Sequence, residues 1–320
     1  MFAAAAALAG CGGGSGSSQI PAGVSNSAQQ NAPGTAGAVL SGTSWQLQAG
    51  GGQDAGALQA LAMLPSAIII DVGDSVTWAV AGEAHTITFN CCAGDPTLPQ
   101  GGSTFNGSNF VSSGVLVPGQ HYTLTFTKAG TYKYACVLHP PEMTGTIIVQ
   151  PRGTAYPGSQ GFYTGLGTSA LKVFLSAADI AVRSDVLFGV GGTMVAAGIS
   201  PFGPSAPPSQ STVLRFLSGD RVNATSVTIR VGTTLTWKNL SSNEPHTVTF
   251  PVAGQPLPPL PGDPFTPPIG GSTYDGSHVT NSGVMNPGQS YSLTFTKAGT
   301  FGYECLFHDA FGMLGTVIVK

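Results

Sequence analysis

Two short segments of this chain each carry a cysteine, a histidine and a methionine in close succession. They are Cys136-Val-Leu-His139-Pro-Pro-Glu-Met143 and Cys305-Leu-Phe-His308-Asp-Ala-Phe-Gly-Met313, and a further histidine precedes each of them, His85 or His246. One thiolate, two imidazoles and one thioether form the ligand set of a blue-copper electron-transfer site. The sequence therefore predicts two copper sites, one built from His85, Cys136, His139 and Met143 and the other from His246, Cys305, His308 and Met313.

The spacing of these ligands suits a loop between two β-strands. In each copy the cysteine ends one strand, the second histidine follows in a tight turn, and the methionine stands just before the final strand. One loop then places three ligands around one point, and the first histidine comes from a neighbouring strand. A lone histidine or methionine more often packs in a core, but four suitable residues at matching positions in two copies favour copper. Copper binding would itself drive deprotonation of each thiol.

The two segments belong to a long internal repeat. Ser103–His139 aligns with Ser272–His308 without a gap, and 22 of these 37 positions are identical. Further upstream, Val72–Trp78 matches Val231–Trp237, and His85–Phe89 matches His246–Phe250. A repeat of this length predicts two copies of one fold, each long enough to hold its own core.

The hydrophobic pattern predicts an all-β fold. Short runs with period-2 alternation, separated by many of the 46 glycines and 24 prolines, are typical of β-sandwiches. We expect a tether over 1–40, a first domain over 41–150, a linker and insertion over 151–184, and a second domain over 185–320. Within these parts, Asp54–Leu64 is compatible with a short helix, Gln150–Gly165 with the linker, and Ala170–Ser184 with a helix of unassigned position. The predicted strands lie near 45–48, 67–72, 75–80, 85–89, 122–127, 130–136, 145–149, 193–197, 213–216, 226–230, 233–238, 246–250, 291–296, 299–305 and 315–319.

The charge of the chain limits the possible partners. Charged residues make up 8% of the sequence, the net charge is −3, and the basic residues do not cluster. Nucleic-acid binding is excluded on this ground, because it needs a cationic surface. A protein partner would dock mainly through apolar contact, with weak electrostatic steering.

The N-terminus has features of a bacterial lipoprotein. An apolar run ends in Leu8-Ala-Gly-Cys11, which resembles the motif whose cysteine is lipidated, and a Gly/Ser/Gln/Asn-rich stretch follows as a flexible tether. The run is shorter than a complete signal sequence, and no Lys or Arg precedes it. A start codon assigned too far downstream would explain both features. We therefore expect lipidation at Cys11 and a location outside the cytoplasm, either periplasmic or at the cell surface. The adjacent Cys91 and Cys92 remain, as a vicinal disulfide, as unreactive thiols, or as a pair with a redox or copper-capture role.

The ligand motifs resemble those of the cupredoxin family, in particular the plastocyanin- and pseudoazurin-like proteins. The resemblance covers 41–150 and 185–320, and it implies two tandem Greek-key β-sandwich domains with one type 1 copper ion each. The Cys305–Met313 spacing matches that of plastocyanin, and the Cys136–Met143 spacing is one residue shorter. The family implies an electron carrier between redox proteins rather than an enzyme. It also implies that His139 and His308 lie at an exposed end, as the ports for electrons.

Other copper chemistries fit the sequence less well. Multicopper oxidases resemble this chain in stacking cupredoxin domains, but their trinuclear cluster needs several His-x-His pairs, and none occurs among the six histidines. In oxidases and copper nitrite reductases, a histidine flanks the copper-binding cysteine. Neither motif cysteine of this chain has such a neighbour. His121 and His278, which the repeat does not share, are expected at the surface. Copper storage or delivery remains the main alternative to electron transfer.

Overall fold

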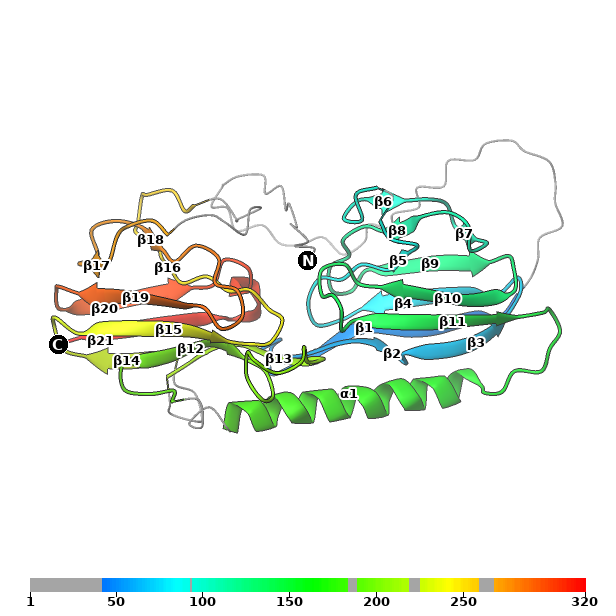
Figure 1. Ribbon diagram of the computed structural model, residues 1–320, viewed down its shortest axis with the longest axis horizontal. Helices are drawn as coiled ribbons and strands as arrows, with labels where there is room; N and C mark the ends of the chain where they lie inside the picture. Colours follow the sequence, from blue (N-terminus) through cyan, green and yellow to red (C-terminus); the bar gives the residue numbers. More distant parts are fainter. Residues whose placement is uncertain (1–41, 93, 184–188, 219–224, 259–267) are drawn as a thin grey trace, which may run out of the picture.

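Two β-sandwich units lie end to end and share one continuous sheet (Figure 1). The computed structural model describes residues 42–92, 94–183, 189–218, 225–258 and 268–320. A ten-stranded sheet runs through both units in the order β17-β19-β15-β12-β13-β2-β1-β4-β9-β7. A second sheet, β3-β11-β10-β5-β8-β6, closes the first unit, and a third, β14-β21-β20-β16-β18, closes the second. The chain thus forms tandem all-β domains, as the sequence predicts.

In the part of the chain that the structure describes, the first unit has eleven strands. They are β1 (Ser44–Gln53), β2 (Leu58–Leu64), β3 (Ala67–Asp71), β4 (Ser75–Val80), β5 (Thr88–Phe89), β6 (Pro99–Gln100), β7 (Thr104–Phe105), β8 (Val111–Ser113), β9 (His121–Phe126), β10 (Gly130–Ala135) and β11 (Thr144–Gln150). Alternate residues of β4 are buried, as a strand with one face on a core requires. The core centres on Trp78, whose ring packs against Phe89 and Tyr134 and whose Nε1–H donates to the Tyr134 hydroxyl at 2.9 Å.

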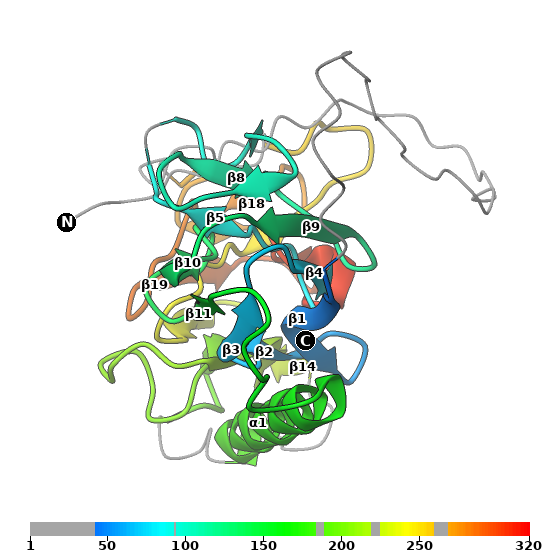
Figure 2. The ribbon, with the colours of Figure 1, turned by 90° about the vertical axis from the view of Figure 1, so that its right-hand side faces the viewer.

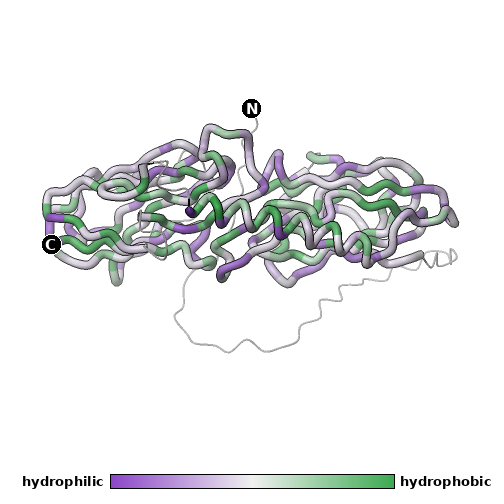
Figure 3. Tube along the Cα trace, turned by 90° about the horizontal axis from the view of Figure 1, so that it is seen from below, coloured by the Kyte–Doolittle hydropathy of each residue, from purple (hydrophilic) through white to green (hydrophobic). Residues whose placement is uncertain are grey.

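The second unit repeats this plan, with ten strands among its described residues. They are β12 (Met194–Ile199), β13 (Ser211–Leu217), β14 (Ser226–Ile229), β15 (Thr234–Leu240), β16 (Thr249–Phe250), β17 (Thr273–Tyr274), β18 (Thr280–Asn281), β19 (Ser290–Phe295), β20 (Gly299–Glu304) and β21 (Leu314–Val319). Trp237 takes the central place in the core, with Phe250 and Tyr303 against its ring. Hydrophobic residues recur along the strands of both units (Figure 3).

The two units are joined by antiparallel pairing of β2 with β13, in the register Ser211↔Ala60, Thr212↔Gln59 and Val213↔Leu58. The expectation of a short helix within Asp54–Leu64 is therefore wrong, because Leu58–Leu64 is a strand that is buried along its whole length. An apolar run buried on both faces has no alternation, so its periodicity does not separate a strand from a helix.

One long helix, α1 (Gln160–Arg183), lies beneath the join and packs along β2, β13 and β1 (Figures 1 and 2). It begins within the expected linker and includes the apolar run at 170–183. Ala178 and Ala181 of α1 share a buried cluster with Leu58 of β2 and Val213 of β13. By length and composition this helix is apolar enough to cross a bilayer, and only 17% of its most apolar window is buried in the structure. Its packing makes it a brace for both units.

Candidate metal centres

The first ligand cluster is buried at one end of the first unit, beside the second unit. Cys136 Sγ lies 3.5 Å from His139 Nδ1 and 3.8 Å from His85 Nδ1, and the two Nδ1 atoms are 3.1 Å apart. Cys136 and His85 are fully buried. Strong metal donors that converge in this way, with both imidazoles turned to the sulfur through Nδ1, fit a copper ion.

The second cluster has the same geometry. Cys305 Sγ lies 3.5 Å from His308 Nδ1 and 3.8 Å from His246 Nδ1, and the two Nδ1 atoms are again 3.1 Å apart. In both clusters the first histidine lies outside the regular strands, contrary to the expected strands 85–89 and 246–250. His85 instead forms an isolated bridge with Leu116, and His246 forms one with Met285.

Each methionine closes its ligand loop onto the cysteine. The Cys136 N–H donates to the Met143 carbonyl at 2.9 Å, and the Cys305 N–H donates to the Met313 carbonyl at 3.1 Å. Both methionines are fully buried. The second loop takes up its extra residue in a 3₁₀ turn, η2 (Asp309–Phe311), so both spacings return the methionine to the same place beside the cysteine.

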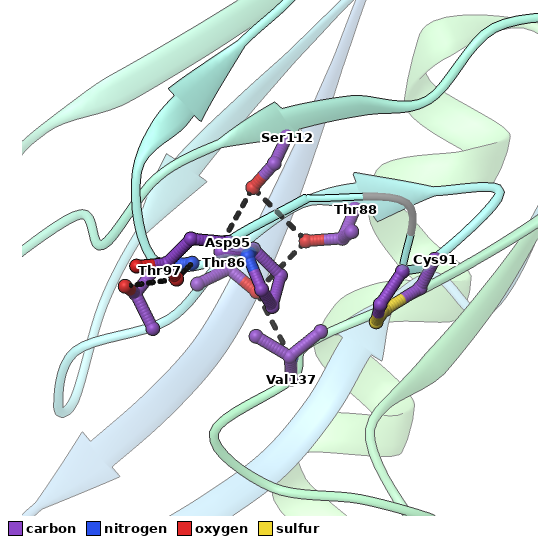
Figure 4. The surroundings of a disulfide bond; sticks show 9 residues. Thr86, Thr88, Cys91, Asp95, Thr97, Ser112 and Val137 are labelled. Carbon is purple, nitrogen blue, oxygen red and sulfur yellow. Dashed lines mark hydrogen bonds between the residues drawn. A yellow bond between two sulfur atoms is a disulfide. The ribbon is translucent and has the colours of Figure 1, made fainter. Parts of the chain in front are cut away.

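A threonine after each first histidine supports the sulfur and the loop. The Thr86 N–H donates to Cys136 Sγ at 3.3 Å, and its Oγ1 accepts from the Val137 N–H at 2.9 Å (Figure 4). Thr247 makes the equivalent contacts with Cys305 Sγ at 3.3 Å and the Leu306 N–H at 2.8 Å. Such outer contacts orient metal ligands and tune the metal. Sequence reasoning missed these residues, although the repeated His-Thr pair carries the signal.

A glycine lies against the ring of each first histidine. Gly50 has φ of +72° and Gly198 has φ of +71°. A Cβ at Gly50 would overlap His85 Nε2, and one at Gly198 would overlap His246 Nε2. Both glycines stand at irregularities in strand pairing, in β1 and β12. The backbone therefore bends to make room for each imidazole.

Comparison with known proteins agrees with this arrangement. The model of the family "Copper binding proteins, plastocyanin/azurin family" matches residues 52–150 and 221–320. The chain belongs to the plastocyanin/azurin family. Plastocyanin of Scenedesmus fuscus is 36% identical over 96 residues, which is 30% of this chain and 82% of that protein. Amicyanin of Paracoccus denitrificans is 31% identical over 121 residues, 38% of this chain and 74% of the relative. Among solved structures, a purple cupredoxin from Nitrosopumilus maritimus is 20% identical with a TM-score of 0.25, covering 40% of this chain and all of the other.

This plastocyanin/azurin-type chain thus has two copper sites, one in each cupredoxin domain. The donor set, its burial and its duplication fit two copper ions. When bound, copper supplies one-electron redox chemistry.

The position of His139 and His308 differs from the expectation of two exposed ports. Their exposed fractions are only 6% and 4%, because the two ligand loops face one another across the domain junction. His139 Nε2 lies 3.7 Å from Glu83 Oε2 and 3.9 Å from Glu244 Oε1. His308 Nε2 lies 3.9 Å from the same Glu83 oxygen and 3.8 Å from Glu244 Oε2. In this tandem chain, the end of each domain that carries these histidines is covered by the other domain.

Glu83 and Glu244 were missed by sequence reasoning. The signal was present, because each stands two residues before a first histidine, as Glu83-Ala-His85 and Glu244-Pro-His246. We call Glu83, Glu244, His139 and His308 the junction cluster.

The junction cluster has strongly perturbed protonation. Burial raises the pKa of Glu83, but the imidazoles of His139, His308 and His85 together lower it by more, to about 2. Burial, together with the charge of Glu83, raises the pKa of Glu244 to about 8. Burial lowers the pKa of His308 to about 4, whereas the charges of Cys136 and the two carboxylates outweigh burial and raise that of His139. The contacts made by the two domains within the junction cluster have nearly the same lengths. The four side chains therefore titrate as one coupled group.

The two ligand cysteines also differ in the direction of their pKa shifts. Burial raises the pKa of Cys305 to about 11. Burial also raises the pKa of Cys136, but the His139 and His85 imidazoles together outweigh it and lower that pKa well below the usual range. The donor distances in the two sites are the same, so the difference comes from the electrostatic effect of His139 on Cys136, which has no counterpart of similar size at Cys305. A bound metal would hold both cysteines as thiolates.

The remaining candidates lie away from the copper ligands or outside the described residues. Cys91 and Cys92 form a vicinal disulfide in the turn after β5 (Figure 4), which is one of the alternatives left by the sequence. His121 is exposed, and His278 is partly exposed and contacts the Gly270 carbonyl through Nε2 at 3.0 Å. Cys11 lies outside the described residues.

Proposed function

We propose that this chain is a two-centre blue-copper protein that carries single electrons between redox proteins. The observation that carries the proposal is the duplicated, buried Cys–His–His cluster with a methionine on the same loop. Plastocyanin and amicyanin among its relatives support a carrier of this type. The chain is proposed to act as a carrier and not as an enzyme, because no His-x-His pair is available for a trinuclear cluster.

The protein's own residues contribute a rigid donor set. Each cysteine is held by two backbone hydrogen bonds, one to its sulfur and one through its N–H to the methionine carbonyl. Each first histidine is fixed by paired backbone bonds to the neighbouring segment, 2.9 and 2.8 Å in the first unit. Side chains held in this way change little when the charge of a site changes, which lowers the reorganisation that electron transfer requires.

Copper loading tests this function. Residues 42–320, loaded with Cu(II) and freed of excess metal, should hold two copper ions per chain and show an intense blue band that ascorbate bleaches. Metal analysis and visible spectroscopy measure both. Copper that is colourless and easily removed by a Cu(I) chelator would instead support storage or delivery. Turnover of O₂ or nitrite by the loaded protein would contradict the assignment as a carrier.

We also propose that the protein acts outside the cytoplasm of a bacterium, anchored to the membrane through lipid on Cys11. The Leu-Ala-Gly-Cys11 motif and the polar tether after it support this location. Substitution Cys11→Ser in the full chain, produced with a complete signal sequence, should move the protein from the membrane fraction to the soluble fraction. Equal membrane association of both forms, measured by fractionation, would argue against the anchor. Ser17→Ala, a substitution in the same stretch of the sequence, is the control and should leave fractionation unchanged.

A further inference from the structure

The junction cluster is built symmetrically from both domains. Glu83 and Glu244 occupy equivalent places in the repeat, and so do His139 and His308. Each carboxylate contacts the imidazole of its own domain and that of the other domain, at 3.7 to 3.9 Å. The two imidazoles that complete the two copper sites therefore meet at one shared pair of carboxylates.

The burial of this pair needs an explanation. Glu83 and Glu244 are only 5% and 4% exposed, and Oε1 of each lacks a hydrogen-bond partner. Within the described residues, their ion-pair contacts are with His139 and His308. A buried carboxylate costs several kcal/mol unless positive charge compensates it. An imidazole whose Nδ1 binds a metal cation turns a polarised Nε2–H toward these oxygens, and so compensates them.

The two ligand loops are also locked against the opposite domain. Gln210 donates through Nε2 to the Glu142 carbonyl of the first ligand loop at 3.1 Å. Phe311 of the second loop lies against Gly56 of the first domain, where an added Cβ would be 3.0 Å from the ring. Arg215 and Asp54 form an ion pair across the join at 2.8 Å. Together with the β2–β13 pairing, these contacts hold the two sites in a fixed relation.

We propose that the two copper sites form one coupled unit that exchanges electrons inside the chain, through His139 and His308, with Glu83 and Glu244 as positioning residues. The inference rests on the proposed function. In the exchange, one electron leaves one site as the other site gains it, so one site is oxidised and the other reduced without a net proton. The two Nε2 atoms lie 3.7 and 3.9 Å from the same Glu83 oxygen, so their separation cannot exceed the sum of these two distances.

The shared carboxylates predict that each glutamate acts on the site of the other domain. In a Cys136→Ser chain, which keeps only the second site, Glu83→Gln should raise the reduction potential of that second site. The reason is that removing a buried negative charge favours the more reduced, less positive state. We expect at least a tenfold shift in the equilibrium with a redox mediator, equivalent to 59 mV for a one-electron couple.

Asp95→Asn is the matched control, because Asp95 is an exposed carboxylate of the first domain with its own hydrogen bonds to Thr97. It should leave both potentials unchanged. A shift confined to the glutamate's own domain would overturn the inference, as would equal effects of the control. A third tightly bound metal ion per chain, lost in Glu83→Gln, would also overturn it, because the carboxylates would then serve as ligands of that ion.

Electron exchange itself is measured on the wild-type chain, half reduced and loaded with two coppers. By NMR, the ring resonances of His85 and of His246 should each exchange between their oxidised and reduced positions at a rate that does not depend on protein concentration. A rate proportional to concentration would mean that electrons pass between molecules, and would overturn internal exchange. Blue sites with independent potentials would contradict this inference alone, whereas the absence of blue sites would contradict the proposed function.

Discussion

Cys136→Ser should remove one blue centre and leave the other intact. The thiolate is the strongest donor of the site and the source of the intense visible band, and a serine hydroxyl does not ionise near neutral pH to replace it. Copper should fall from two ions per chain to one, and the blue absorbance should fall by about half. Cys305→Ser should give the mirror result, and the double variant should be colourless. Metal analysis and visible spectroscopy of the purified chains measure these outcomes.

The disulfide offers the control for the loss of a cysteine. Cys91 and Cys92 are bonded to each other, so replacing both with serine should leave two coppers and the full blue band. If Cys136→Ser kept two blue centres, the assignment of the first site would be wrong. If either single variant lost both centres, the two sites would depend on each other for folding or for metal uptake.

Gly50→Ala should weaken the first site selectively. Its Cβ would overlap His85 Nε2, and the ring cannot move away without leaving its position 3.8 Å from Cys136 Sγ. The left-handed backbone adds about 1–2 kcal/mol of strain for any residue with a Cβ. We expect at least a tenfold loss of copper affinity at the first site and little change at the second, measured by competition with a chelator. Gly198→Ala should reverse the two outcomes.

Gly119→Ala separates the overlap from the strain. Gly119 also has a positive φ, +87°, but an added Cβ would meet nothing within 4 Å. This variant should lose stability in thermal unfolding and keep both copper sites at full affinity. Equal loss of copper from Gly119→Ala and Gly50→Ala would show that backbone strain, and not contact with the imidazole, governs the site.

Much of each site was predictable from the sequence because its ligands are local. Cys136, His139 and Met143 lie on one loop, and a repeat that preserves the same residue types marks them as functional. The strands beside them alternate clearly, since one face of each packs on Trp78 or Trp237. The structure brings His85 and His246 to their loops as predicted, although each forms an isolated bridge instead of lying within a regular strand.

The relation between the domains was not predictable in the same way. The β2–β13 pairing depends on contacts between segments that are about 150 residues apart, and the buried run Leu58–Leu64 carries no alternation to mark it as a strand. The burial of His139 and His308 follows from that pairing, so the family resemblance, which rests on single domains, placed them at a surface. Glu83 and Glu244 could have been noticed as a repeat, but their meeting requires the docked arrangement.

The continuous sheet also has a consequence for solubility. Taken separately, each domain would end its large sheet in a seven-residue strand, β2 or β13, with unpaired backbone groups. Long exposed edges of this kind are templates for aggregation. Joined, the sheet ends instead at β7 and β17, which are two residues long each. Pairing of the two domains thus covers the β2 and β13 edges, through which separate domains would most readily pair with other chains.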